Sequence, residues 1–196
     1  MLQFAMAFML TLSSVNPDVS GVGQDVPAGS QRVAELKVSE RYRFNLGGES
    51  GSYTDWERYD LPRFDGLYAK IQFEKIYGKP KDKWASIARI NFLGAGEGKD
   101  QKKLSILLEV NRKNHKPTAM IKRTKGADSE TFDVDLAADQ PIEISVTALT
   151  PDNLLLTFNG RQYEIAHDFE IHGISVIASG ADVKFEPFNL MRQANP

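Results

Sequence analysis

Polar side chains alternate with apolar ones along three stretches of the sequence, and these polar positions are the first candidates for chemistry. Seven residues take them: Lys70, Gln72 and Glu74 in 67–76, Arg89 and Asn91 in 84–93, and Glu109 and Asn111 in 103–113. Amides, carboxylates and cations together supply hydrogen-bond donors and acceptors at short range, which the hydroxyl groups of sugars require. If the three stretches lie side by side in one sheet, the seven residues predict a ligand-binding face.

An ordinary solvated sheet face explains the same seven residues. Alternation by itself demands polar side chains on the outer face of an antiparallel sheet. Lys–Glu pairs across neighbouring strands would then contribute only tenths of a kcal/mol each. Both interpretations stay open at the level of sequence.

Four aromatic residues could extend such a face as stacking platforms: Tyr53, Trp56, Tyr59 and Trp84. Tyr53 and Trp56 fall within 47–66, a glycine-rich stretch that we expect to be a long loop, and loops of that length are often functional. For Trp56 and Trp84, burial at the edge of the core is the competing interpretation, because an indole hides a large apolar area.

Catalytic and phosphate-binding signatures are weak. A hydrolase needs two carboxylates across the scissile bond, at about 5–10 Å, and the best candidates to face each other in this way are Glu74 and Glu109. The chain has no cysteine, and its three histidines lack metal-ligand spacing. The glycines of 94–99 do not meet the phosphate-loop spacing, so we expect a hairpin loop there.

The elements that must position these residues are short strands. Alternation predicts them at 67–76, 84–93, 103–113, 132–136 and 142–149, and 33–46 is either a strand or a short helix. The stretch 154–190 predicts a hairpin with Asn159-Gly160 at its tip, and then a closing strand pair around 179–182. About ten strands and no long helix predict an all-β, two-sheet antiparallel β-sandwich.

Two motifs resemble the concanavalin-A-like lectin/glucanase superfamily, which includes laminin-G-type modules. They are ISVTALTPDNLLLTFNGRQYEI, with its Asn-Gly hairpin, and ISVIASGADVKFEPFNL, with Phe185, Phe188 and Leu190 after a glycine-containing bend. The resemblance covers roughly 64–190. It implies a jelly-roll sandwich with one concave sheet, a surface that often binds carbohydrate.

The resemblance bears on catalysis and on calcium as well. The superfamily's glucanases carry Glu-x-Asp-x-x-Glu on one strand, whereas Phe132-Asp133-Val134-Asp135 lacks both glutamates, and the alginate-lyase signatures are missing. Calcium at a sheet rim is a further implication of the resemblance, and the available acids are Asp128, Asp133, Asp135 and Asp152. They lack EF-hand spacing. We therefore expect no cofactor, with calcium as the alternative.

Composition limits the partners and suggests a compartment. The chain has 196 residues, 24 basic and 26 acidic, with a net charge of −2, which gives no support for nucleic-acid binding. The apolar run Leu2–Leu12 has the length of a signal peptide and is too short to span a bilayer. No basic residue precedes it, so an N-terminal amphipathic helix or strand remains the alternative. We expect 1–31 to be a leader and flexible spacer, and 32–196 to be one sandwich domain.

The resulting expectation is an exported carbohydrate-binding module, secreted or periplasmic, that has a glycan partner and no catalysis of its own. A glycan-active enzyme that uses the same groove is the first alternative. A structural protein of an envelope assembly is the second.

Overall fold

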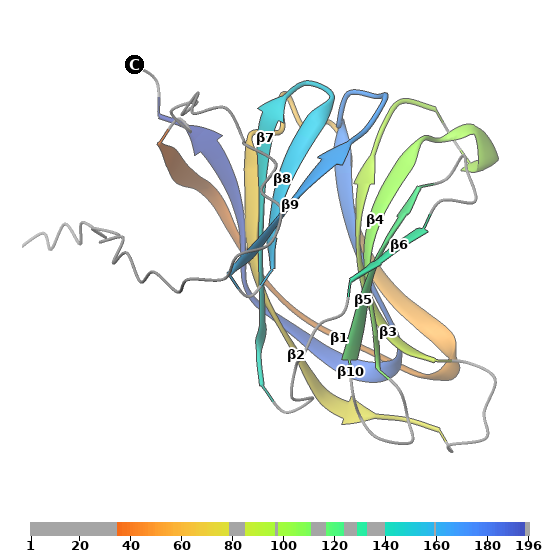
Figure 1. The fold of residues 1–196 in the computed structure, drawn as a ribbon. Coiled ribbons are helices and arrows are strands. Elements are labelled where there is room, and N and C mark those ends of the chain that lie inside the picture. The colour runs from red at the N-terminus through yellow and green to blue at the C-terminus, as the bar shows by residue number, and fades with distance from the viewer. Residues whose placement is uncertain are drawn as a thin grey trace, which may run out of the picture. The chain divides into compact units, whose positions relative to one another are not determined.

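The alternating stretches form one antiparallel sheet that folds over into two layers (Figure 1). This computed structural model describes residues 35–78, 85–96, 98–110, 117–123, 129–132, 140–158 and 160–194, all in the compact unit Val33–Pro196. These residues form ten strands and one short 3₁₀ turn, Gly98–Asp100. The strands are β1 Leu36–Arg58, β2 Gly66–Ile76, β3 Ser86–Leu93, β4 Lys103–Val110, β5 Pro117–Arg123, β6 Ser129–Phe132, β7 Ile142–Thr150, β8 Asn153–Phe158, β9 Arg161–Ala166 and β10 Gly173–Gln193.

The two layers diverge along β10. Its first part pairs with β3 over Gly173–Ser179, its second part pairs with β2 over Ala181–Met191, and β1 pairs with both parts. We call β6-β5-β4-β3 with the first part of β10 the β3 layer. The β2 layer is β9-β8-β7-β2 with the second part of β10. The β-sandwich predicted from the sequence is confirmed.

A bend at Gly180 carries β10 from one layer to the other. Its φ of +64° lies in the left-handed region, which glycine adopts without a Cβ clash. Opposite it, β1 shifts its register between Gly48 and Tyr53. The Ser179 hydroxyl donates a hydrogen bond to the Ser52 carbonyl oxygen and ties the two bends together.

Two expectations about these bends are wrong. Residues 47–58 belong to strand β1 rather than to a loop, because 47–48 and 53–58 pair with β10, and only 59–65 connect β1 to β2. The closing strand pair around 179–182 is one continuous strand. Glycine allows a bend without ending a strand, and the sequence pattern does not separate these two outcomes.

The hairpin expected at Asn159-Gly160 is confirmed. Phe158 pairs with Arg161, so a two-residue turn joins β8 to β9, and Gly160 has a φ of +84°. Asn159 itself lies outside the described residues, as do 1–34 and 133–139, which contain the predicted leader and most of the predicted strand 132–136.

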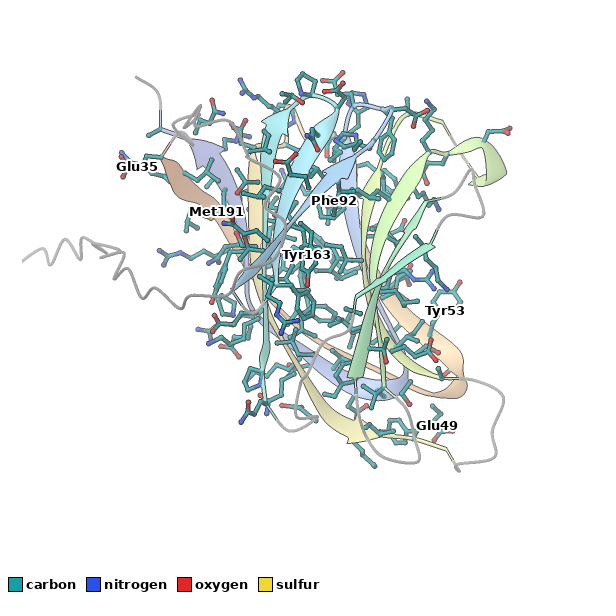
Figure 2. The ribbon with its side chains drawn as sticks, in the orientation of Figure 1. Glu35, Glu49, Tyr53, Phe92, Tyr163 and Met191 are labelled. Atoms are coloured by element: carbon teal, nitrogen blue, oxygen red, sulfur yellow. The ribbon has the colours of Figure 1, made fainter. Side chains whose placement is uncertain are left out.

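The core lies between the layers and follows the alternation closely. From β2 it takes Leu67, Ala69, Ile71 and Phe73, and from β3 it takes Ala88, Ile90 and Phe92. Figure 2 shows Phe92 and Tyr163 between the two layers, with Tyr53 on the outer side of β1. An aromatic cluster of Tyr42, Phe44, Trp56 and Phe188 packs against this core from β1 and β10.

Candidate functional site

The structure divides the predicted binding face between the two layers. Strands β2 and β3 pair with different parts of β10, before and after the bend at Gly180, so Lys70, Gln72 and Glu74 lie on the outer face of the β2 layer. Arg89, Asn91 and Glu109 lie on the outer face of the β3 layer. The three strands belong to one sheet, as the prediction required, but the sheet folds over between β2 and β3, so these six residues are divided between two layers. Asn111 and Trp84 lie outside the described residues.

Asn91 is a packing residue of the β3 layer. Its side chain is 4% exposed, its amide donates a hydrogen bond to Ser175 Oγ at 2.7 Å, and its Oδ1 accepts one from Ser105 Oγ at 2.7 Å. These residues are register partners on β10, β3 and β4. Buried amides need such partners, so the ladder accounts for Asn91 without a ligand.

Arg89 and Tyr53, both on the β3 layer, remain candidates for contact with a ligand. Arg89 is half-buried, its Nε has no hydrogen-bond acceptor among the described residues, and burial lowers the pKa of its guanidinium. Tyr53 is 69% exposed. It lies on the outermost strand, β1, and pairs with Ser179 of β10. The structure does not test whether either residue binds a ligand.

Trp56 points to the interior rather than to the outer face. Its ring lies 4.6 Å from that of Phe44 and 4.9 Å from that of Tyr42, centroid to centroid. These are distances of packed aromatic pairs. Burial at the edge of the core, the competing sequence interpretation, accounts for this tryptophan.

The carboxylate pair considered for a hydrolase does not converge. Glu74 projects from the outer face of the β2 layer and Glu109 from the outer face of the β3 layer, with the core between them. Of the acids considered for calcium, only Asp152 is described, and it accepts a hydrogen bond from Thr150 Oγ1 at 2.6 Å. Within the described ranges no three His, Asp or Glu side chains gather as metal ligands do.

A groove crosses the outer face of the β2 layer where β1, β10 and β2 run side by side. It consists of two adjoining depressions of about 450 and 350 Å³ that share Glu186 and Pro187. We call it the outer groove, and its other lining residues are Arg41, Tyr42, Arg43, Lys70, Gln72, Lys184 and Asn189. Lys70 and Gln72, two of the predicted residues, thus line this groove.

Glu186 is the electrostatic centre of the outer groove. Its carboxylate pairs with Arg43 Nε at 3.0 Å and with Lys184 Nζ at 2.8 Å. The hydrogen bond from Lys184, helped by the charge of Arg43, lowers the pKa of Glu186 below its ordinary value of 4.5. Both ion pairs therefore persist until the pH falls through that lowered pKa, and the groove becomes more positive below it.

Removing the Lys184 ammonium should raise the pKa of Glu186. We expect the carboxyl of Lys184→Met to titrate at a higher pH than in the unmodified protein, because its largest stabilising contact is lost. NMR titration of the Glu186 side-chain carbon measures this directly. Lys70→Met is the matched control, since Lys70 pairs with Glu143 at 2.8 Å instead. An unchanged Glu186 titration in Lys184→Met would contradict the assigned ion pair.

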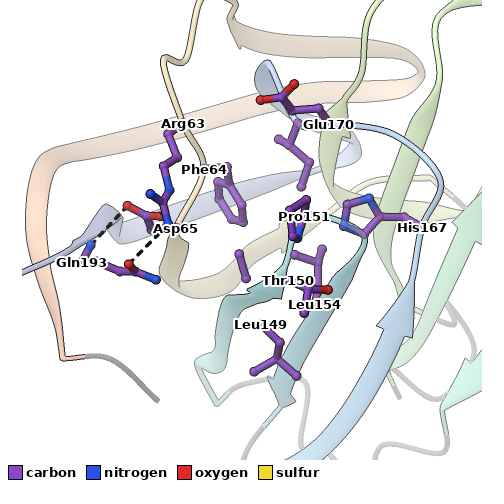
Figure 3. Close-up of a pocket in the computed structure, with 12 residues that line it drawn as sticks. Arg63, Phe64, Asp65, Leu149, Thr150, Pro151, Leu154, His167, Glu170 and Gln193 are labelled. Carbon is purple, nitrogen blue, oxygen red and sulfur yellow. Dashed lines mark hydrogen bonds and ion pairs between the residues drawn. The ribbon is translucent and has the colours of Figure 1, made fainter. Parts of the chain in front are cut away.

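A second concave site lies at one end of the β2 layer, and sequence reasoning missed it entirely. This pocket of about 360 Å³ lies among the segment before β2, the β7–β8 turn, the β9–β10 connection and the end of β10 (Figure 3). We call it the end pocket. The residues used below are Arg63, Phe64, Asp65, Pro151, His167 and Glu170. They are scattered over three connections, so no periodic pattern signals them.

No helix among the described residues is long and apolar enough to cross a membrane.

Comparisons with known proteins support the fold but do not identify a function. No protein-family model and no curated protein matches the chain significantly. An E230A fructofuranosidase from Schwanniomyces occidentalis, complexed with fructosylnystose, is similar over 87% of this chain and 35% of its own, at 10% identity and TM-score 0.52. The chain therefore spans about a third of that enzyme.

Two further solved structures are similar at lower TM-scores. Scytalido-glutamic peptidase matches over 76% of each chain, at 12% identity and TM-score 0.49. The carbohydrate-binding module CBM66 from Bacillus subtilis matches over 80% of this chain and 95% of its own, at 10% identity and TM-score 0.46. Together with the layer topology, the fructofuranosidase likeness supports a two-layer antiparallel β-sandwich fold.

Proposed function

We propose that the protein binds polysaccharide chains along the outer groove, without catalysis of its own. The observation that carries the proposal is the chemistry of the groove, because the structural likenesses concern the fold alone. In this proposal the chain is exported, as the apolar run Leu2–Leu12 predicts, so that the groove meets extracellular or periplasmic glycans.

The groove offers donors and acceptors in close alternation. Arg41 supplies a cation that has no ion-pair partner among the described residues, and Gln72 supplies a carboxamide that both donates and accepts. Asn189 Oδ1 is buried and accepts no hydrogen bond from the described residues. A buried, unpaired carbonyl costs free energy that a ligand hydroxyl would recover, so Asn189 is the strongest single indication of a ligand.

The extent of the groove favours a chain over a small molecule. Neighbouring strands lie about 4.8 Å apart, so the three strands span roughly 10 Å. The two depressions adjoin at Glu186 and Pro187, which line both. An extended glycan chain could therefore lie across all three strands.

Affinity electrophoresis through gels that contain a neutral polysaccharide (dextran or laminarin) or an acidic one (alginate or chondroitin sulfate) tests the proposal. We expect at least one polysaccharide to retard the protein. The double variant Gln72→Ala/Asn189→Ala should bind roughly 30- to 100-fold more weakly, because each lost hydrogen bond contributes about 1–1.5 kcal/mol. Retardation by the acidic chains alone would assign the main contact to Arg41.

The matched control lies on the other layer. Tyr53→Ala and Glu109→Gln change exposed or half-exposed groups of the β3 layer and should leave retardation unchanged. If these variants lose binding and the groove variant keeps it, the ligand lies on the β3 layer. Absence of retardation by all four polysaccharides would contradict the proposed function.

A further inference from the structure

We infer that the end pocket is a second binding site, distinct from the outer groove, that holds a single uncharged sugar ring. About 360 Å³ lies at the lower end of the range for small-molecule sites and suits one ring better than an oligosaccharide. The inference goes beyond the proposed function, because it depends on other residues at another end of the sandwich.

His167 presents an unpaired nitrogen at this pocket. Its Nδ1 lies 2.7 Å from the carbonyl oxygen of Phe169, and since a carbonyl can only accept, Nδ1 carries the proton. In a neutral imidazole with this tautomer, the lone pair is on Nε2. That atom is buried and has no hydrogen-bond partner among the described residues. A ligand hydroxyl placed there would donate to Nε2 and remove the cost of its burial.

Arg63 faces the pocket from the opposite side, and its 67% exposed side chain contacts Asp65 and Gln193. Its Nε pairs with Asp65 Oδ1 at 2.6 Å, and Asp65 is only 5% exposed. Asp65 Oδ2 also accepts a hydrogen bond from the backbone N–H of Gln193, and Gln193 Oε1 accepts one from Arg63 Nη2 at 3.3 Å (Figure 3). Because a guanidinium carries five N–H donors, Arg63 keeps donors for a second hydroxyl.

An apolar surface lies between these polar groups. Figure 3 shows the Phe64 ring and Pro151 between Arg63 on one side and His167 on the other. Phe64 is 9% exposed and packs edge-on against Phe92 at 5.3 Å, so the core holds its ring in place. A sugar ring has an apolar C–H face and a rim of hydroxyls, and this arrangement complements both.

The charges of the pocket select against anions. The charge of Arg63 is already neutralised by the buried Asp65 carboxylate, and Glu170 adds a second carboxylate at the rim, 74% exposed. A uronic acid or a phosphate would therefore meet net negative charge. An uncharged sugar ring is not repelled by these carboxylates. We therefore propose an uncharged sugar as the ligand of this pocket.

NMR titration of the ¹⁵N-labelled full chain tests the inference. The probes are the methyl glycosides of glucose, galactose, mannose and fructose, with methyl glucuronoside as the anionic comparison. We expect at least one neutral glycoside to produce saturable shifts of the Phe64, Thr150 and His167 amides. His167→Asn keeps an N–H that can reach the Phe169 carbonyl but has no group at Nε2, and it should weaken binding roughly tenfold.

Three controls make the result decisive. His172→Asn makes the same change at a histidine that does not line the pocket, and it should leave the affinity unaltered. Arg63→Lys keeps the charge beside Asp65 while removing donors, and it replaces His167→Asn if that variant fails to fold. The groove variant Gln72→Ala/Asn189→Ala should retain full monosaccharide binding, so failure of the groove and failure of the end pocket are distinguishable.

The inference is overturned if no neutral glycoside gives saturable shifts, if only the glucuronoside binds, or if His167→Asn binds like the unmodified protein.

Discussion

Replacing Phe188 by alanine is expected to lower the free energy of unfolding by about 3–5 kcal/mol. Phe188 is fully buried, and its ring lies 5.4 Å from that of Phe44 and 6.3 Å from that of Trp56, centroid to centroid. The substitution opens a cavity where β1, β10 and the core meet, and rings held by two paired strands cannot collapse to fill it. Urea denaturation followed by tryptophan fluorescence measures the loss.

Tyr53→Ala serves as the matched control for this prediction. It removes an aromatic ring from β1, the strand that pairs with β10, but this ring is 69% exposed. Its effect should stay within about 0.5 kcal/mol, as is usual for surface substitutions. A Phe188→Ala protein with nearly unchanged stability would mean that the aromatic cluster does not pack as described.

Replacing Asn91 by alanine is expected to cost about 2–3 kcal/mol, the second-largest effect on stability. The substitution removes one buried and one partly buried hydrogen bond, and it leaves Ser175 Oγ and Ser105 Oγ without their partner. A double-mutant cycle of Asn91→Ala with Ser105→Ala isolates the hydrogen bond between these two side chains. We expect a coupling free energy of roughly 0.5–1.5 kcal/mol.

Asn91 is also a test of the predicted binding face. If it only packs the β3 layer, Asn91→Ala lowers stability and leaves polysaccharide affinity unchanged at temperatures where the protein stays folded. A stable Asn91→Ala protein that loses affinity would instead show that this amide contacts the ligand. Asn91 is only 4% exposed, and its side-chain amide already makes two hydrogen bonds. Both observations favour the first outcome.

The outer groove shows how a correct local prediction can leave the neighbouring strands undetermined. Alternation places Lys70 and Gln72 on the outer face of their strand, and the structure confirms that they line a depression. Their partners in it come from β1 and β10, not from β3 and β4. Arg41, Lys184 and Asn189 are far from Lys70 in sequence, and only strand pairing brings them to the same face.

By itself the sequence determined the local geometry of each strand. A side-chain period of two fixes which residues face the core, so Ile71 and Phe73 point inward and Gln72 outward whatever the neighbouring strand. Asn159-Gly160 likewise fixes the register of the β8–β9 hairpin, because a two-residue turn needs φ angles that glycine supplies.

Only the tertiary structure decided which faces meet. Strands β2 and β3 both pair with β10, but on opposite sides of the bend at Gly180, and they therefore enter different layers. The end pocket depends on the same long-range packing, since it brings Arg63 and His167 together from connections that have no period. Backbone hydrogen bonds are alike for every strand, so the choice of neighbour depends on the fit of whole faces in the core, and no single stretch encodes that fit.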